Sequence, residues 1–110
     1  MYSLYEIATE KTVALLDRAR TEPRDLYDLW YLTAQSNSVD LNECLEAINA
    51  KLSHRGKKLD DVRNEFYKKE MRLKKTWDTR LSAQIANLPE FDAIYRAVKR
   101  SLRQAKITNA

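Results

Sequence analysis

The sequence predicts an all-α protein, a bundle of five or six helices. One of its 110 residues is glycine, two are proline and 33% are charged, a composition typical of helical chains. Apolar residues recur at spacings of three and four along most of the chain, and no alternating strand pattern or Asn-Gly turn occurs. A chain of this length has room for one domain, which we expect to span residues 1–110.

The first helix is predicted to begin at a capping box made by Ser3 and Glu6 and to run to about Ala19. Residues 20–22 form a short loop, so we expect the next helix to pack back on the first as an antiparallel hairpin at the N-terminus. One face of the first helix is apolar; it carries Leu4, Ile7, Ala8, Ala14 and Leu15.

The second helix is predicted to begin at Pro23, which fits the first helical position because a proline lacks the N–H that would be unpaired there. The polar residues 35–40 predict a loop. Asp40 and Glu43 then form a second cap pair before an amphipathic helix that ends near Gly56. Cys44 lies on the apolar face of this helix, and because it is the only cysteine we expect a small core residue.

Three further helices are predicted in the second half of the chain. Leu59, Val62 and Phe66 indicate a short helix, and the last helix begins at Pro89 and carries Phe91, Ile94, Tyr95, Val98 and Leu102 inward. Residues after 105 are expected to fray. The helix between these two has a core stripe formed by Trp77, Leu81, Ile85 and Leu88. We interpret Trp77 as a core residue rather than a base-stacking platform.

Lys11 stands out because it falls on the apolar face of the first helix, within one turn of Ile7, Ala8, Ala14 and Leu15. Such a lysine either covers apolar surface with its methylenes and sends its ammonium to water, or directs the ammonium at an anion in a cleft. Periodicity alone leaves both interpretations open.

Candidate partners for Lys11 follow in the segment RDLYD, residues 24–28, which opens the second helix. Asp25 projects at the margin of the apolar arc, Asp28 lies one turn on, and Arg24 is adjacent. Acidic groups in a first turn are favoured by the helix dipole, so both carboxylates can be explained structurally. A buried ion pair between Lys11 and Asp25 is the strongest structural explanation of both residues, since buried charges need partners.

The runs EIATEKTVALLDR and PRDLYDLWYL resemble the two C-terminal motifs of AbiEii/AbiGii-type toxin nucleotidyltransferases, which belong to the DNA polymerase β-like nucleotidyltransferase superfamily. Thr9 is a departure in the first motif, and the rest of the chain is similar to the helical tail of that family. The positions that match as they stand are Glu6, Ala8, Glu10, Lys11, Ala14, Leu15, Arg18, Arg24, Asp25, Tyr27, Asp28 and Leu29.

The resemblance implies transfer of a nucleotidyl group from a nucleoside triphosphate to an acceptor, tRNA in the characterised branch. It gives Lys11 contact with nucleotide phosphate and Asp25 a supporting active-site role, and it has Asp28 and Arg24 order the surroundings. Asp28 is thereby a further candidate catalytic residue, and Arg24 and Arg18 are candidate substrate-binding residues with Lys11. It also implies Mg²⁺ and a partner, either an upstream chain with the catalytic lobe or a cognate antitoxin.

One departure from the family is severe. Its members carry a glycine-rich motif and a D-x-D pair that binds two magnesium ions, whereas this chain has a single glycine, Gly56, and no D-x-D. Nucleotidyl transfer depends on metal ions and positioning groups. We therefore expect the C-terminal helical lobe of such an enzyme, truncated or separately encoded, without a metal site and inactive alone. A stand-alone enzyme with unusual metal ligands is the remaining catalytic possibility.

The charge is unevenly distributed. Residues 1–50 contain four basic and nine acidic side chains, and residues 51–80 contain eleven basic and five acidic ones. A basic lobe either is a solvated helical surface or attracts polyanions by releasing their counterions. The alternative function is thus a non-catalytic module that binds nucleic acid or protein. Its candidate RNA contacts are Lys68, Lys69, Arg72, Lys74 and Lys75.

The location expected from the sequence is the cytoplasm, without membrane contact. The sequence shows neither a signal peptide nor an apolar run of transmembrane length.

Overall fold

The computed structural model describes residues 3–109 and confirms the all-α prediction, because this range contains helices and no strands. Within it, no helix has the length and hydropathy needed to cross a membrane. The elements are α1 (Leu4–Leu15), α2 (Pro23–Trp30), the π-helical turn η1 (Tyr31–Gln35), the 3₁₀ turn η2 (Leu41–Cys44), α3 (Leu45–His54), α4 (Leu59–Val62), α5 (Glu65–Lys68), α6 (Glu70–Leu81) and α7 (Phe91–Gln104).

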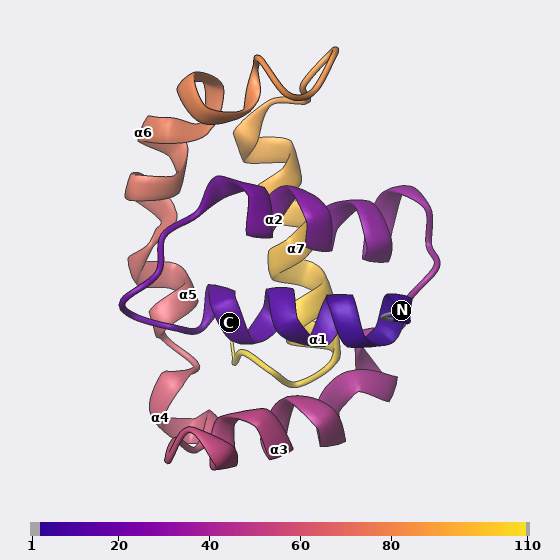
Figure 1. Cartoon of the computed structure of the whole chain (residues 1–110), viewed down its shortest axis with the longest axis vertical. Helices are drawn as coiled ribbons and strands as arrows, with labels where there is room; N and C mark the ends of the chain where they lie inside the picture. The colour runs from indigo at the N-terminus through magenta and orange to yellow at the C-terminus, as the bar shows by residue number, and fades with distance from the viewer. Residues whose placement is uncertain (1–2, 110) are drawn as a thin grey trace.

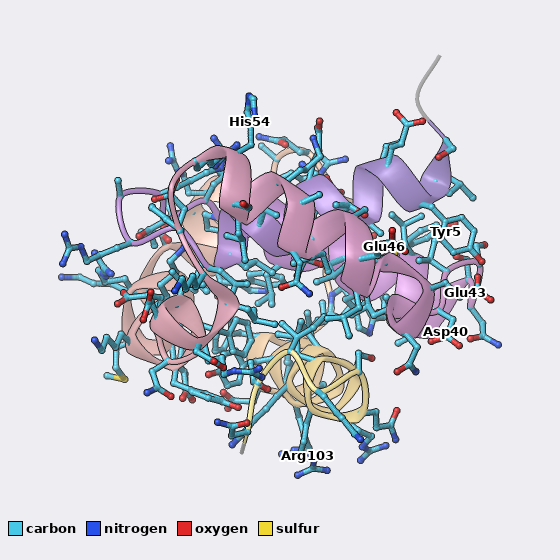
Figure 2. All side chains as sticks on the ribbon, turned by 90° about the horizontal axis from the view of Figure 1, so that it is seen from below. Tyr5, Asp40, Glu43, Glu46, His54 and Arg103 are labelled. Atoms are coloured by element: carbon cyan, nitrogen blue, oxygen red, sulfur yellow. The ribbon has the colours of Figure 1, made fainter. Side chains whose placement is uncertain are left out.

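Helix α1 lies at the centre of the arrangement. It packs against α2 on one side and α3 on the other, and the loop of residues 16–22 turns the chain back from α1 to α2 (Figure 1). Helix α7 crosses behind both and packs on α2, while α6 contacts α2 and α7. Polar side chains such as His54 and Arg103 point away from the body of the molecule (Figure 2).

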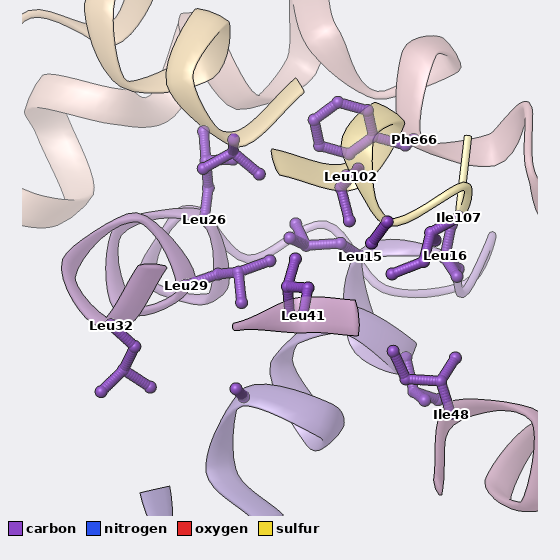
Figure 3. Close-up of a cluster of buried hydrophobic side chains, with 14 of the residues drawn as sticks. Leu15, Leu16, Leu26, Leu29, Leu32, Leu41, Ile48, Phe66, Leu102 and Ile107 are labelled. Carbon is purple, nitrogen blue, oxygen red and sulfur yellow. The ribbon is translucent and has the colours of Figure 1, made fainter. Parts of the chain in front are cut away.

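The core forms where α1, α2, α3 and α7 meet, and leucine predominates in it (Figure 3). Trp77 is 2% exposed, packs edge-on against Phe91 with ring centroids 5.6 Å apart, and donates from Nε1 to the Pro89 carbonyl at 3.0 Å. The interpretation of Trp77 as a core residue is therefore confirmed. Cys44 is also buried, as predicted.

Helix α1 begins as predicted but ends earlier. The Ser3 hydroxyl accepts the backbone N–H of Glu6 at 3.1 Å, whereas the helix stops at Leu15 instead of near Ala19. The Asp17 carboxylate accepts the Ala19 N–H at 2.9 Å, a local bond that competes with helical continuation. The Ala14 carbonyl accepts the Asp17 N–H at 3.2 Å and the Lys69 ammonium at 2.9 Å, so Lys69 adds a second hydrogen bond at the helix end.

Two helices of the second half are shorter than predicted. The segment with Leu59, Val62 and Phe66 is divided between α4 and α5, and α6 ends at Leu81, so that Ile85 and Leu88 pack on the core from a turn. Asn87 in this turn has φ 53°, a left-handed conformation that a helix cannot contain.

The predicted end of α3 near Gly56 is confirmed. Gly56 has φ 72°, and the Lys57 N–H reaches back to the Leu52 carbonyl at 2.8 Å, as in a Schellman cap.

The prediction that residues after 105 fray is wrong. Ile107 and Thr108 are buried, and the Ile107 N–H bonds to the Leu102 carbonyl at 2.9 Å. The Arg63 guanidinium donates to the carbonyls of Lys106 and Ile107. The tail is thus held by a side chain more than forty positions upstream, which local sequence patterns do not reveal.

Candidate functional site

The structure places the Lys11 ammonium between two carboxylates of the neighbouring helix. Lys11 Nζ lies 3.2 Å from Asp25 Oδ1 and 3.0 Å from Asp28 Oδ2. Periodicity positions all three, since Lys11 faces α2 from α1 while Asp25 and Asp28 lie one turn apart on α2. The α2 N-terminus is fixed by Pro23 and by Glu22, whose carboxylate accepts the Arg24 N–H at 3.4 Å.

Two arginines complete this ion-pair network. Arg20 donates to Asp25 from Nε at 2.7 Å and from Nη2 at 3.3 Å, and Arg24 donates from Nε to Asp28 Oδ1 at 2.8 Å. Arg24 also donates to the Gln84 side chain at 3.1 Å. The sequence placed Arg20 only in a loop. Because Arg20 lies five residues before Asp25, and helical neighbours are three or four apart, spacing did not indicate this contact.

Burial makes Asp25 the anchor of the network. Its side chain is 2% exposed, whereas that of Lys11 is 24% exposed. A buried carboxylate is tolerated only when paired, and here it has two cationic partners. Burial opposes the charge of Lys11, but the hydrogen bond that Lys11 donates to Asp28 and the charges of Asp28 and Asp25 outweigh it and raise the pKa of Lys11 above its usual value. The ammonium therefore stays protonated at neutral pH.

On one side the network opens into a groove of about 420 Å³ between α1 and α3, which we call the polar groove. Its cationic groups outnumber its acidic ones. Lys51 is 3.4 Å from Glu10, and Arg55 is 3.8 Å from Asp17, whose pKa is lowered mainly by the Ala19 N–H. The lining residues are Glu10, Lys11, Val13, Ala14, Asp17, Arg20, Asp25, Lys51 and Arg55.

A second groove, of about 300 Å³, lies along α1 and α2 beside Asp28, and we call it the aromatic groove. The rings of Tyr27 and Tyr31 are stacked with centroids 6.5 Å apart, and Trp30 lies 5.5 Å from Tyr27. The lining residues are Ile7, Arg24, Tyr27, Asp28, Tyr31 and Leu32. The ion-pair network contributes side chains to both grooves.

The other residues singled out from the sequence lie outside the network. Arg18 is exposed on the loop of residues 16–22. Lys68 pairs with Glu65 and Lys74 with Asp92, each at 3.3 Å. Arg72 and Lys75 line a groove of about 560 Å³ on α6 with Arg80.

The prediction that Lys69 contacts an RNA backbone is wrong. Lys69 is 1% exposed, and its ammonium points at the end of α1. Burial lowers the pKa of Lys69 from 10.5 to about 8. Lys69 is therefore a structural residue that links α1 to the second half of the chain.

Lys69 also predicts a pH dependence of stability. Its pKa of about 8 in the fold returns to 10.5 on unfolding, so between these values the unfolded chain binds more protons. The free energy of unfolding should therefore gain up to about 3 kcal/mol from this group as the pH rises from 8 to 10.5. Urea titrations of Lys69→Met at both pH values should lack this gain, and the exposed-site control Lys68→Met should keep it. Identical pH dependence in the two variants would contradict the assignment.

The donor set does not fit the magnesium ions implied by the sequence resemblance. Within residues 3–109, no group of three or more His, Cys, Asp or Glu side chains could hold a metal. All four oxygens of Asp25 and Asp28 already face an ammonium or guanidinium group. A divalent cation would meet three positive side chains here.

Comparison with known proteins gives one family. The family model described as nucleotidyl transferase AbiEii toxin, type IV TA system, matches residues 1–97. No curated protein and no solved structure matches the chain. The matched region contains the whole ion-pair network and both grooves.

Proposed function

Because the chain belongs to the nucleotidyl transferase AbiEii toxin family, we propose that it supplies the helical lobe of such an enzyme, as a truncated or separately encoded piece. In this role Lys11 contacts the phosphates of a nucleoside triphosphate, and Asp25 and Asp28 hold the lysine in place. The magnesium ions are bound by a portion outside the residues described here. The chain alone is then inactive.

The single observation that carries this proposal is the ammonium held between two carboxylates. A lysine ammonium has three N–H donors, and Asp25 and Asp28 occupy two of them. The third remains for an anion at the polar groove, which Lys11 lines. A cation fixed in advance stabilises the charge of a transferring phosphoryl group without reorganising. Arg20, which is half exposed, adds a second cation on the same side.

Nucleotide binding tests the role of Lys11. Equilibrium dialysis with each of the four labelled ribonucleoside triphosphates should show binding that Lys11→Ala weakens at least about tenfold, because a charge-assisted hydrogen bond is lost. Lys74→Ala is the matched control, since Lys74 is exposed and pairs with Asp92 away from the network. Circular dichroism would verify that both variants fold. Equal affinities of Lys11→Ala and Lys74→Ala would refute the role.

Inactivity of the isolated chain is tested with magnesium, labelled nucleoside triphosphates and bulk tRNA. No label should be transferred to the tRNA unless a metal-binding portion is added. Transfer by the chain alone that disappears in Lys11→Ala would show that this part of the proposal is wrong.

The family description names a type IV toxin–antitoxin system. We therefore propose that the partner is a chain bearing the metal-binding lobe or a cognate antitoxin, met in the cytoplasm. An upstream open reading frame with the glycine-rich and D-x-D motifs would favour a split enzyme.

A second candidate, a nucleic-acid-binding module, is supported by the groove on α6. Arg72, Lys75 and Arg80 of α6 line this groove, with Thr21, Thr76 and Thr79 and no acidic side chain. This function predicts tRNA binding that weakens steeply with salt and does not depend on Lys11. Replacing Arg72 and Lys75 by alanine should reduce the slope of log affinity against log salt by about 2, whereas alanine at Lys68 and Lys74 should change it less. Unchanged slopes in both double variants would exclude this surface.

A further inference from the structure

We propose that the aromatic groove is a subsite for the base of a nucleotide. The inference rests on the proposed role of Lys11 as a phosphate contact, and it adds the place of the base. The site is formed by Tyr27 and Tyr31 with Arg24 and Asp28 at its polar edge.

The shape and lining of the groove suit a planar ring. Its volume is about 300 Å³, and its lining combines the apolar Ile7 and Leu32 with Tyr27 and Tyr31. Tyr31 is 47% exposed, so part of its side chain is accessible to a ligand. Every base has a π-face that stacks on such a ring, whatever its sequence identity.

The polar edge offers both a donor and an acceptor. The Arg24 guanidinium lies 5.8 Å from the centre of the Tyr27 ring and donates to Asp28 Oδ1. Bases present donors and acceptors along their edges, and guanidinium planes also stack on bases. Arg24 and Asp28 can thus contact the edge of a base whose face lies on a tyrosine.

The connection to Lys11 selects a nucleotide over other aromatic ligands. Asp28 lines the aromatic groove and is 3.0 Å from the Lys11 ammonium, which lines the polar groove. A molecule with an aromatic ring at one end and a polyanion at the other therefore meets a suitable surface on both sides of one ion-pair network.

The backbone at Tyr31 gives independent support. The π-helical turn η1 begins at Tyr31, whose carbonyl accepts the Ser36 N–H at 2.8 Å, and such turns recur at functional sites.

The fluorescence of Trp30, which lies beside Tyr27, reports on binding at the aromatic groove. The chain has two tryptophans, so Trp77→Phe leaves Trp30 as the only one. Its fluorescence should be quenched by nucleoside triphosphates and not by tripolyphosphate, which lacks the base. Equilibrium dialysis with Trp77 intact would give the same affinities without relying on that substitution.

We expect the nucleoside triphosphate to bind at least about tenfold more tightly than tripolyphosphate. Tyr31→Ala should remove this advantage and leave the affinity for tripolyphosphate unchanged, whereas Lys11→Ala should weaken both ligands. Tyr5→Ala is the matched control, because Tyr5 is another exposed tyrosine and lies beside Asp40 and Glu43 instead (Figure 2).

The outcomes separate the two proposals. Equal affinities for the two ligands, or equal effects of Tyr31→Ala and Tyr5→Ala, would overturn the base subsite while leaving the phosphate contact of Lys11. If neither the nucleoside triphosphate nor tripolyphosphate binds, both the base subsite and the phosphate contact of Lys11 are overturned. A change of oligomeric state in Tyr31→Ala, measured by sedimentation with unchanged nucleotide affinity, would show that the groove is a protein interface and not a base site.

Discussion

Replacing Asp25 by alanine is expected to lower the free energy of unfolding by about 3–5 kcal/mol, the usual cost of removing one partner from a buried ion pair. Asp25 is almost fully buried and pairs with both Lys11 and Arg20. Without it, Arg20 loses its carboxylate and Lys11 keeps only Asp28. Urea unfolding at pH 7, followed by circular dichroism, measures the loss.

Asp28→Ala is the matched control for this prediction. Asp28 is 23% exposed, and Lys11 would keep its contact with Asp25, so the expected loss is about 1 kcal/mol. Equal losses in the two variants would mean that burial of Asp25 does not set the stability of the network. A loss below about 1 kcal/mol for Asp25→Ala would contradict the prediction itself.

Replacing Trp77 by alanine is expected to cost about 3–5 kcal/mol, the range for deleting a large aromatic side chain from a core. The indole fills space beside Phe91, and its N–H holds the Pro89 carbonyl just before α7. Thermal unfolding should show a correspondingly lower Tm.

Trp77→Phe separates packing from hydrogen bonding. It keeps most of the ring and removes the Nε1 donor, so about 1–3 kcal/mol should be lost, chiefly from leaving the Pro89 carbonyl unpaired. If Trp77→Ala left stability unchanged but weakened tRNA binding, the core assignment would have to be replaced by a base-stacking one.

Much of the fold was accessible from local sequence signals. Composition and spacing predicted the all-α class, Ser3 marked the start of α1, Gly56 marked the end of α3, and Trp77 and Cys44 were placed in the core. Each of these features depends on neighbours within about one helical turn or on average hydrophobicity.

Several of the errors share a physical cause, which is contact between residues far apart in the chain. The end of α1 depends partly on Lys69, and the order of the C-terminal tail depends on Arg63. Neither partner could be chosen from the many lysines and arginines of the sequence. The same reason explains why Lys69 was assigned to an exposed RNA surface.

The candidate site was predicted in part. Periodicity and the family resemblance singled out Lys11, Asp25 and Asp28, which the structure brings together. Arg20 was missed because a loop arginine has no periodic signal. The aromatic groove was missed because it requires Ile7 of α1 beside Tyr27 and Tyr31, and only the packed helices show that pairing.

The contact between Lys69 and the Ala14 carbonyl joins residues 55 positions apart, so it has a consequence for folding during synthesis. The ribosome must release the 55 residues that follow Ala14 before the Ala14 carbonyl can receive this ammonium. The end of α1 therefore gains this hydrogen bond only after α2, α3, α4 and α5 have been synthesised.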